Sequence, residues 1–188
     1  GGAAFHAHVR GFLAGFQLAF LFKAQTHASV EYGHARLEEM DSRSPAAALI
    51  AAIEHLVLHP HDVKALWVCY EAHTTMGETK KAVGVLLRLK DLGEDPHRIV
   101  AQLVQLNKLG VLSPTERMRL ADKAANDLRI HLLESVVAEP DSEHERPNAL
   151  LALAEVSNGE ARQALLAELN KKYALHSATQ AARAKGLM

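Results

Sequence analysis

Apolar residues recur at helical spacing along most of the chain, and strict alternation of polar and apolar residues is nearly absent. Ser44-Pro45 and Ser113-Pro114 each join an N-cap hydroxyl to a proline suited to the first helical position. Glycines punctuate the ends of these stretches at Gly77, Gly93, Gly110 and Gly159. The pattern predicts an all-α protein. The expected helices cover residues 4–24, 45–58, 62–76, 78–92, 96–109, 114–138, 146–157 and 160–175.

The first of these segments differs from the rest. Residues 11–22 are apolar on every face apart from one glutamine, whereas the later helices mix charged residues with Leu, Val and Ala. Extension back to residue 3 supplies the roughly 20 residues that a membrane-spanning helix needs. The extension includes His6, His8 and Arg10, and ionisable side chains within a span are expected to be functional. We therefore expect one transmembrane helix over residues 1–24.

Composition changes after this helix. Residues 25–43 are polar and of mixed charge, as expected for a juxtamembrane linker. Residues 44–176 are expected to form a soluble helical domain, as a solenoid or bundle, and residues 177–188 a frayed tail. Because the most apolar stretch lies at the first residues, we expect the chain to be an N-terminally truncated piece of a longer polypeptide.

Small residues and helix breakers between residues 60 and 96 follow a repeat-like spacing. They are Pro60, Ala65, Ala72, Gly77, Ala82 and Pro96. This pattern resembles a tetratricopeptide unit, in which small residues mark the contacts between two antiparallel helices and a glycine forms the turn. The aromatic residue of the pattern is displaced by one place, to Trp67, and the unit is two residues longer than usual. The resemblance implies a helical module that binds a protein partner; a generic helical hairpin is the alternative.

The apolar N-terminal segment carries a second pattern. His8 is followed by Gly11 and Gly15, and the apolar run then ends at Lys23. Positions i, i+3 and i+7 share one helix face, so His8 would stand above two glycines that let a neighbouring helix approach closely. The pattern resembles the last core transmembrane helix of the rhomboid intramembrane serine proteases. A buried capping helix of a helical bundle is the alternative interpretation.

The rhomboid resemblance implies a Ser–His dyad with His8 as the general base. Gly11 and Gly15 would then pack against the helix that carries the serine. No Gly-x-Ser-Gly motif precedes His8, so the nucleophile would lie upstream of this chain, and activity would belong to the longer polypeptide. Arg10 stands where the family usually has a small residue, which is typical of an inactive relative as well.

The charge balance, the single cysteine and the histidine spacing limit the ligands and partners that we expect. Twenty-one Lys and Arg residues against 22 Asp and Glu leave a net charge of -1, so nucleic acid is not expected to bind. Cys69 is the single cysteine, and its apolar neighbours predict a buried, inert thiol. The pairs His6/His8 and His59/His61 lack the spacing of helical metal ligands, so neither a metal nor another cofactor is expected.

Two functions from different classes remain. The first is the C-terminal part of an intramembrane serine protease in a bacterial inner or plasma membrane, which contacts membrane lipid and cleaves transmembrane protein substrates. The second is a non-enzymatic helical repeat scaffold, whose first helix is a membrane anchor or a capping helix. In both, the helical domain binds a protein partner.

Overall fold

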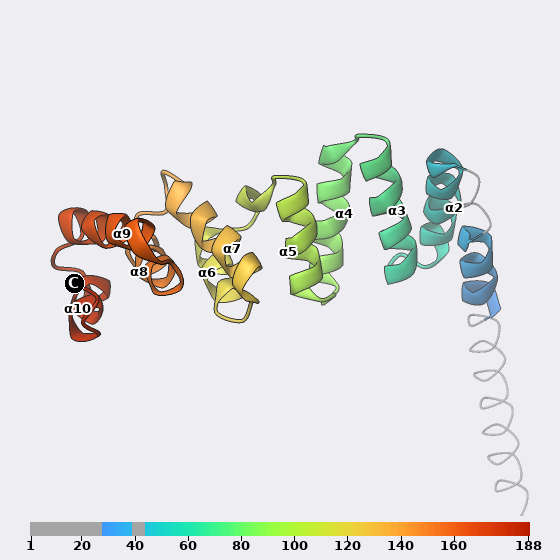
Figure 1. The fold of residues 1–188 in the computed structure, drawn as a ribbon. Coiled ribbons are helices and arrows are strands. Elements are labelled where there is room, and N and C mark those ends of the chain that lie inside the picture. Colours follow the sequence, from blue (N-terminus) through green and yellow to red (C-terminus); the bar gives the residue numbers. More distant parts are fainter. Residues whose placement is uncertain (1–27, 39–43) are drawn as a thin grey trace, which may run out of the picture. The chain divides into compact units, whose positions relative to one another are not determined.

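The computed structural model describes residues 28–38 and 44–188, and these residues are all-α, as predicted (Figure 1). The expected transmembrane helix over residues 1–24 lies outside the described residues. Within the described ranges, none of the helices combines the length and the apolar character that crossing a membrane requires.

Residues 28–38 form a first helical segment. The helices that follow are α2 (Pro45–Leu58), α3 (Val63–Thr75), α4 (Thr79–Asp91), α5 (Pro96–Gln105), the short 3-10 helix η1 (Leu109–Val111), α6 (Pro114–Ala121), α7 (Asn126–Ala138), α8 (Arg146–Val156), α9 (Gly159–Lys172) and α10 (Ser177–Ala184). The chain divides into two compact units, Gly1–Leu92 and Gly93–Met188, called unit 1 and unit 2 below.

In the described part of unit 1, α2, α3 and α4 pack side by side in chain order (Figure 1). Their core is built largely of small residues: Ala51 and Ala52 of α2 and Ala65 of α3 are buried, as is Leu37 of residues 28–38. Alanine at the contact lets two helix backbones come close, so these helices pack along much of their length.

The turn between α3 and α4 follows from one glycine. Gly77 has φ = +74°, a conformation that costs an L-residue with a Cβ roughly 1–2 kcal/mol. The Glu78 amide then donates to the His73 carbonyl at 2.8 Å, which completes a Schellman C-cap. The sequence predicted helices over 62–76 and 78–92, and the structure agrees to within a few residues.

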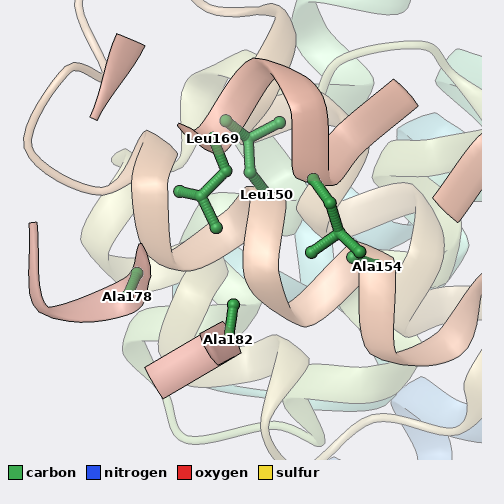
Figure 2. Packing of buried hydrophobic residues seen from close by; sticks show 6 residues of the cluster. Leu150, Ala154, Leu169, Ala178 and Ala182 are labelled. Atoms are coloured by element: carbon green, nitrogen blue, oxygen red, sulfur yellow. The ribbon is translucent and has the colours of Figure 1, made fainter. Parts of the chain in front are cut away.

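Unit 2 contains α5 to α10. Its buried apolar cluster joins α8, α9 and α10 through Leu150, Ala154, Leu169, Ala178 and Ala182 (Figure 2). Helix α10 thus packs against α8 and α9, and the prediction of a frayed tail from residue 177 was wrong. The residues of α10 that make this contact, Ala178 and Ala182, are small, so the sequence there lacks the large apolar side chains that indicate a packed helix.

Three other boundaries differ from the predictions. The expected single helix over 114–138 is broken between α6 and α7, which pack against each other, because burying both apolar faces requires the chain to reverse. Asn107, at φ = +53°, ends α5 in place of Gly110, which lies in η1. Residues 28–38, expected within a linker, are helical and bury Leu37.

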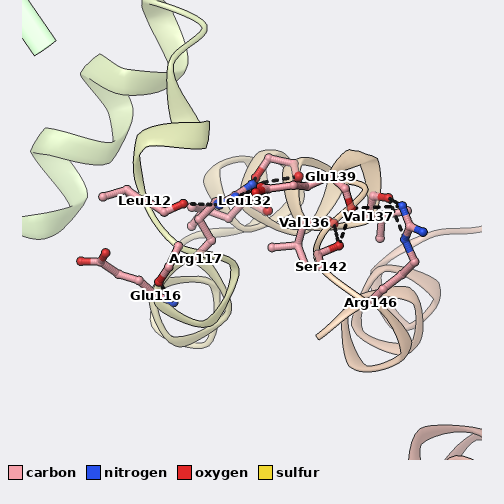
Figure 3. Close-up of polar contacts among 11 residues, drawn as sticks. Leu112, Glu116, Arg117, Leu132, Val136, Val137, Glu139, Ser142 and Arg146 are labelled. Atoms are coloured by element: carbon pink, nitrogen blue, oxygen red, sulfur yellow. Dashed lines mark hydrogen bonds and ion pairs between the residues drawn. The ribbon is translucent and has the colours of Figure 1, made fainter. Parts of the chain in front are cut away.

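A buried arginine network connects α6 to α7 in unit 2 (Figure 3). Arg117 of α6 is 1% exposed, and its guanidinium donates to the carbonyls of Leu112 and Ser135 at 3.0 and 2.9 Å. It also forms an ion pair with Glu139. A buried charge is tolerated only when it is paired and hydrogen-bonded, and this guanidinium meets both conditions.

Candidate functional site

Of the residues singled out in the sequence, His8, Gly11 and Gly15 lie outside the described residues. The repeat residues lie within unit 1. Ala65 and Ala72 of α3 and Ala82 of α4 are all buried, and Gly77 forms the turn between these helices. Trp67 lies edge-on to Tyr70, with ring centroids 5.5 Å apart.

Cys69 is also buried in unit 1. Burial raises the pKa of the Cys69 thiol, and this effect exceeds the opposing influence of the positive charge on Arg88. A thiol that is both buried and held in the protonated form is a poor nucleophile, as the sequence led us to expect.

A histidine–aspartate cluster, formed by His34, His55 and Asp62, is the most concentrated group of chemically active side chains in unit 1's described part. His34 lies on residues 28–38, His55 in the last turn of α2, and Asp62 at the N-cap of α3. Both Nε2 atoms face one carboxylate oxygen, Oδ2 of Asp62, at 2.7 Å from His34 and 3.1 Å from His55. One ligand atom from each of the three residues lies within 4.8 Å of the others.

The turn between α2 and α3 positions two members of the cluster. Helix α2 ends at Leu58, and the amide of the next residue, His59, donates to the His55 carbonyl at 2.9 Å. Asp62 then caps α3, because its Oδ1 accepts from the Ala65 amide at 2.9 Å. With Oδ1 committed to the cap, Oδ2 is directed at the histidines.

Residues 28–38 supply the third member because Gly33 allows a close approach. A Cβ at Gly33 would lie 2.0 Å from Nδ1 of His55, well inside van der Waals contact. The absent side chain therefore makes room for the His55 ring. This close approach places His34, the next residue, against Asp62.

Burial and hydrogen bonding shift the pKa of the Asp62 carboxyl in opposite directions. Partial burial acts to raise the pKa of the Asp62 carboxyl, but hydrogen bonds from the Ala65 amide and from His55 and His34 outweigh it, so this pKa lies below its usual value. The side chains of His55 and Asp62 are 5% and 10% exposed, whereas that of His34 is 29% exposed. The carboxylate is therefore charged and largely enclosed, with its opening toward solvent on the His34 side.

Two further groups border the cluster. The His59 ring lies 4.8 Å from the His55 ring, centroid to centroid, and its Nε2 is 2.8 Å from Ser29 Oγ. A pocket of about 220 Å³ lies beside them, lined by residues that include Tyr32 and Leu58. The described residues of unit 1 thus place imidazoles, a carboxylate and a small partly apolar pocket next to one another.

The sequence did not predict this cluster. The histidine pairs considered there were close neighbours in the chain, whereas the cluster joins His34 and His55 across 21 positions and reaches Asp62 through a turn. The signal within the sequence was the glycine that precedes His34 in a helical stretch, because an interior glycine indicates a close contact.

Comparisons with protein-family models, with curated proteins and with solved structures find no match to this chain.

Proposed function

We propose that residues 44–188 act as a helical repeat module that binds a protein partner. The observation that carries this proposal is the stacking of α2, α3 and α4 through small residues. Helices stacked in this way present extended surfaces to a partner, and each added helix pair lengthens the surface.

The exposed face of α2 supports the same proposal. Ile50, Ile53, Val57 and Leu58 are all at least half exposed, with Val57 at 76%. The first three lie at i, i+3 and i+7, so they follow one face of the helix. A contiguous apolar face of this kind is typical of a surface that a partner covers.

We further propose that this module follows the last core transmembrane helix of a rhomboid-type intramembrane serine protease. The support is the sequence pattern His8-x-x-Gly11-x-x-x-Gly15, followed by the apolar run to Phe22. In this proposal His8 is the base of a Ser–His dyad, the serine belongs to the longer polypeptide, and the substrates are transmembrane proteins. The module would hold a substrate or a regulator close to the protease in the membrane.

The protease proposal is tested with the complete polypeptide in liposomes and a transmembrane reporter substrate. His8→Ala is expected to abolish cleavage, because no base would remain to take the serine proton. His6→Ala, which removes an imidazole two positions away, is the matched control and is expected to retain cleavage.

Arg10→Gly separates an active protease from an inactive relative. Cleavage that only this variant shows would identify a protease disabled by Arg10. If neither wild type nor Arg10→Gly cleaves, the scaffold function with an N-terminal anchor or capping helix replaces the protease proposal.

The binding proposal is tested by proximity labelling in cells with the complete polypeptide. The double variant Ile53→Asp, Val57→Asp is expected to lose specific neighbours, because two carboxylates on the α2 face would have to be desolvated on binding. Leu175→Asp is the control, since Leu175 is 91% exposed and lies in unit 2. Unchanged labelling in the double variant would remove the α2 face from the proposal.

A further inference from the structure

We propose that His34, His55 and Asp62 bind one divalent cation, with Zn²⁺ the preferred ion. The ligand atoms would be Nε2 of each histidine and Oδ2 of the aspartate. The proposal is independent of the rhomboid resemblance, because it depends only on described residues of unit 1.

The spacing of the three atoms is close to that of a coordination sphere. Bonds of about 2.0–2.1 Å in a tetrahedral zinc site put neighbouring ligand atoms about 3.3 Å apart. Asp62 Oδ2 lies 2.7 and 3.1 Å from the two Nε2 atoms, and one ligand atom from each of the three residues lies within 4.8 Å of the others. Small side-chain rotations that separate the oxygen from His34 and bring the imidazoles together would form the site.

The chemistry of the ligands favours zinc over calcium or magnesium. Two imidazole nitrogens and one carboxylate oxygen are ligands that Zn²⁺ accepts, whereas the other two ions take oxygen ligands. Three protein ligands would leave a fourth position open, and His34 is the most exposed of the three, so this position would face solvent on its side.

The surrounding charges permit a cation. The basic residues on the same elements are already paired: Arg36 with Glu54 at 2.8 Å, and Lys64 with Glu38 at 2.5 Å. The cap to the Ala65 amide fixes the carboxylate, which is the orienting role that residues outside the coordination sphere fulfil in metal sites.

Binding requires both Nε2 atoms to be free of protons. In the metal-free cluster, an Nε2–H of each imidazole donates to Asp62 Oδ2. When the cation binds, each neutral ring carries its proton on Nδ1 instead, so the cation replaces the two hydrogen bonds. The ion would then fasten residues 28–38 to the turn between α2 and α3.

The test uses the complete chain without a histidine tag, purified in detergent micelles and stripped of metal with a chelator. Cobalt(II) is titrated as the spectroscopic probe, and zinc binding is measured by calorimetry. We expect one ion per chain, visible d–d absorption from the cobalt form, and displacement of cobalt by zinc. No saturable one-to-one binding of either ion would overturn the proposal.

Three variants assign the site. His34→Ala and Asp62→Asn are each expected to weaken zinc binding by about 100-fold or more, since each removes a ligand. Asp62→Asn keeps an N-cap residue for α3, so the start of this helix is preserved. His61→Ala removes an exposed imidazole next to Asp62 and is expected to bind zinc as wild type does.

Thermal unfolding provides a second measurement. Zinc is expected to raise the Tm of wild type and of His61→Ala, and to leave the Tm of Asp62→Asn unchanged, because a ligand stabilises only the folded state that binds it. If Asp62→Asn and His34→Ala bind zinc as tightly as His61→Ala, the histidine–aspartate cluster is not the metal site.

Discussion

The helix connections of the two units differ in the side chains that recur at them. In unit 1, the turns that follow α2 and α3 each join a histidine to a carboxylate: His55 to Asp62 at 3.1 Å, and His73 to Glu78 at 2.6 Å. In unit 2, arginines donate to the backbone carbonyls at the ends of helices. Arg146 reaches the Val137 carbonyl at 2.6 and 3.0 Å.

Arginine recurs at the next connection of unit 2. Arg162 of α9 donates through Nε to the carbonyls of Ala154 and Ser157, at 3.0 and 2.9 Å, where α8 ends. The last carbonyls of a helix have no partner within it, so a guanidinium with several donors satisfies them and also complements the helix dipole.

The recurring side chains of the two units differ in their acid–base and metal-binding chemistry. A guanidinium stays charged at every pH at which the protein is folded, so the arginine contacts of unit 2 do not vary with pH. Imidazole gains and loses a proton near neutral pH and also binds metals. The turns that follow α2 and α3 in unit 1 therefore contain side chains that can also bind a cation.

The largest effect is expected from the buried arginine of unit 2. Arg117→Ala would leave the Leu112 and Ser135 carbonyls and the Glu139 carboxylate without this partner. Breaking a buried ion pair from one side costs about 3–5 kcal/mol, and Glu139 is 31% exposed, so we expect a loss of about 3 kcal/mol in the free energy of unfolding. Denaturant unfolding of the complete chain measures it.

Arg119→Ala is the matched control, because it removes the same charge from the exposed side of α6. We expect it to change the free energy of unfolding by no more than about 0.5 kcal/mol. Equal losses in the two variants would show that the charge of α6, and not the buried network, stabilises unit 2.

A pair of glycine substitutions tests the close approach in unit 1. Gly33→Ala would put a Cβ 2.0 Å from Nδ1 of His55, and the ring is buried and bonded to Asp62, so it has little freedom to move. We expect a destabilisation of about 1–3 kcal/mol, as for an overpacked core, measured by denaturant unfolding.

Gly84→Ala is the matched control for Gly33→Ala, and we expect it to change the stability in the opposite direction. Gly84 lies within α4 and a Cβ there would meet nothing within 4 Å, so the higher helix propensity of alanine should stabilise the protein by up to about 1 kcal/mol. If Gly33→Ala is as stable as Gly84→Ala, residues 28–38 do not pack against His55 as described.

Features that depend on neighbouring residues in the chain were predictable. Ser44 and Ser113 cap their helices, each accepting from an amide three residues on, with proline at the next position. The helical stretches of α2, α3 and α4 were visible from apolar spacing and from Gly77.

Features that depend on residues far apart in the chain could not be predicted. The break before α7 contains neither glycine nor proline, and it follows from the packing of α6 on α7. Arg117 has the local sequence of an exposed helical arginine, and its partners come from up to 22 positions away. The histidine–aspartate cluster forms only after residues 28–38 fold back on α2.

The smallest effect is expected from the Glu78 carboxylate at the turn between α3 and α4, and this effect depends on pH. Hydrogen bonds from Lys81 and His73 lower the pKa of the Glu78 carboxyl. A carboxyl whose pKa is lower in the folded protein stabilises it fully above its unfolded pKa, and this contribution disappears as the pH falls through the folded pKa. Glu78→Gln should therefore lower the unfolding midpoint at pH 7, and its difference from wild type should shrink as the pH falls and the Glu78 carboxyl becomes protonated.

Glu71→Gln removes the same charge from the exposed part of α3 and is the control at pH 7, where we expect it to shift the midpoint less than Glu78→Gln does. A difference between wild type and Glu78→Gln that does not shrink as the pH falls would mean that Glu78 acts through its shape and not its charge. The turn between α3 and α4 would then resemble the arginine contacts of unit 2, which do not depend on pH, and the contrast between the units would be confined to the histidine–aspartate cluster.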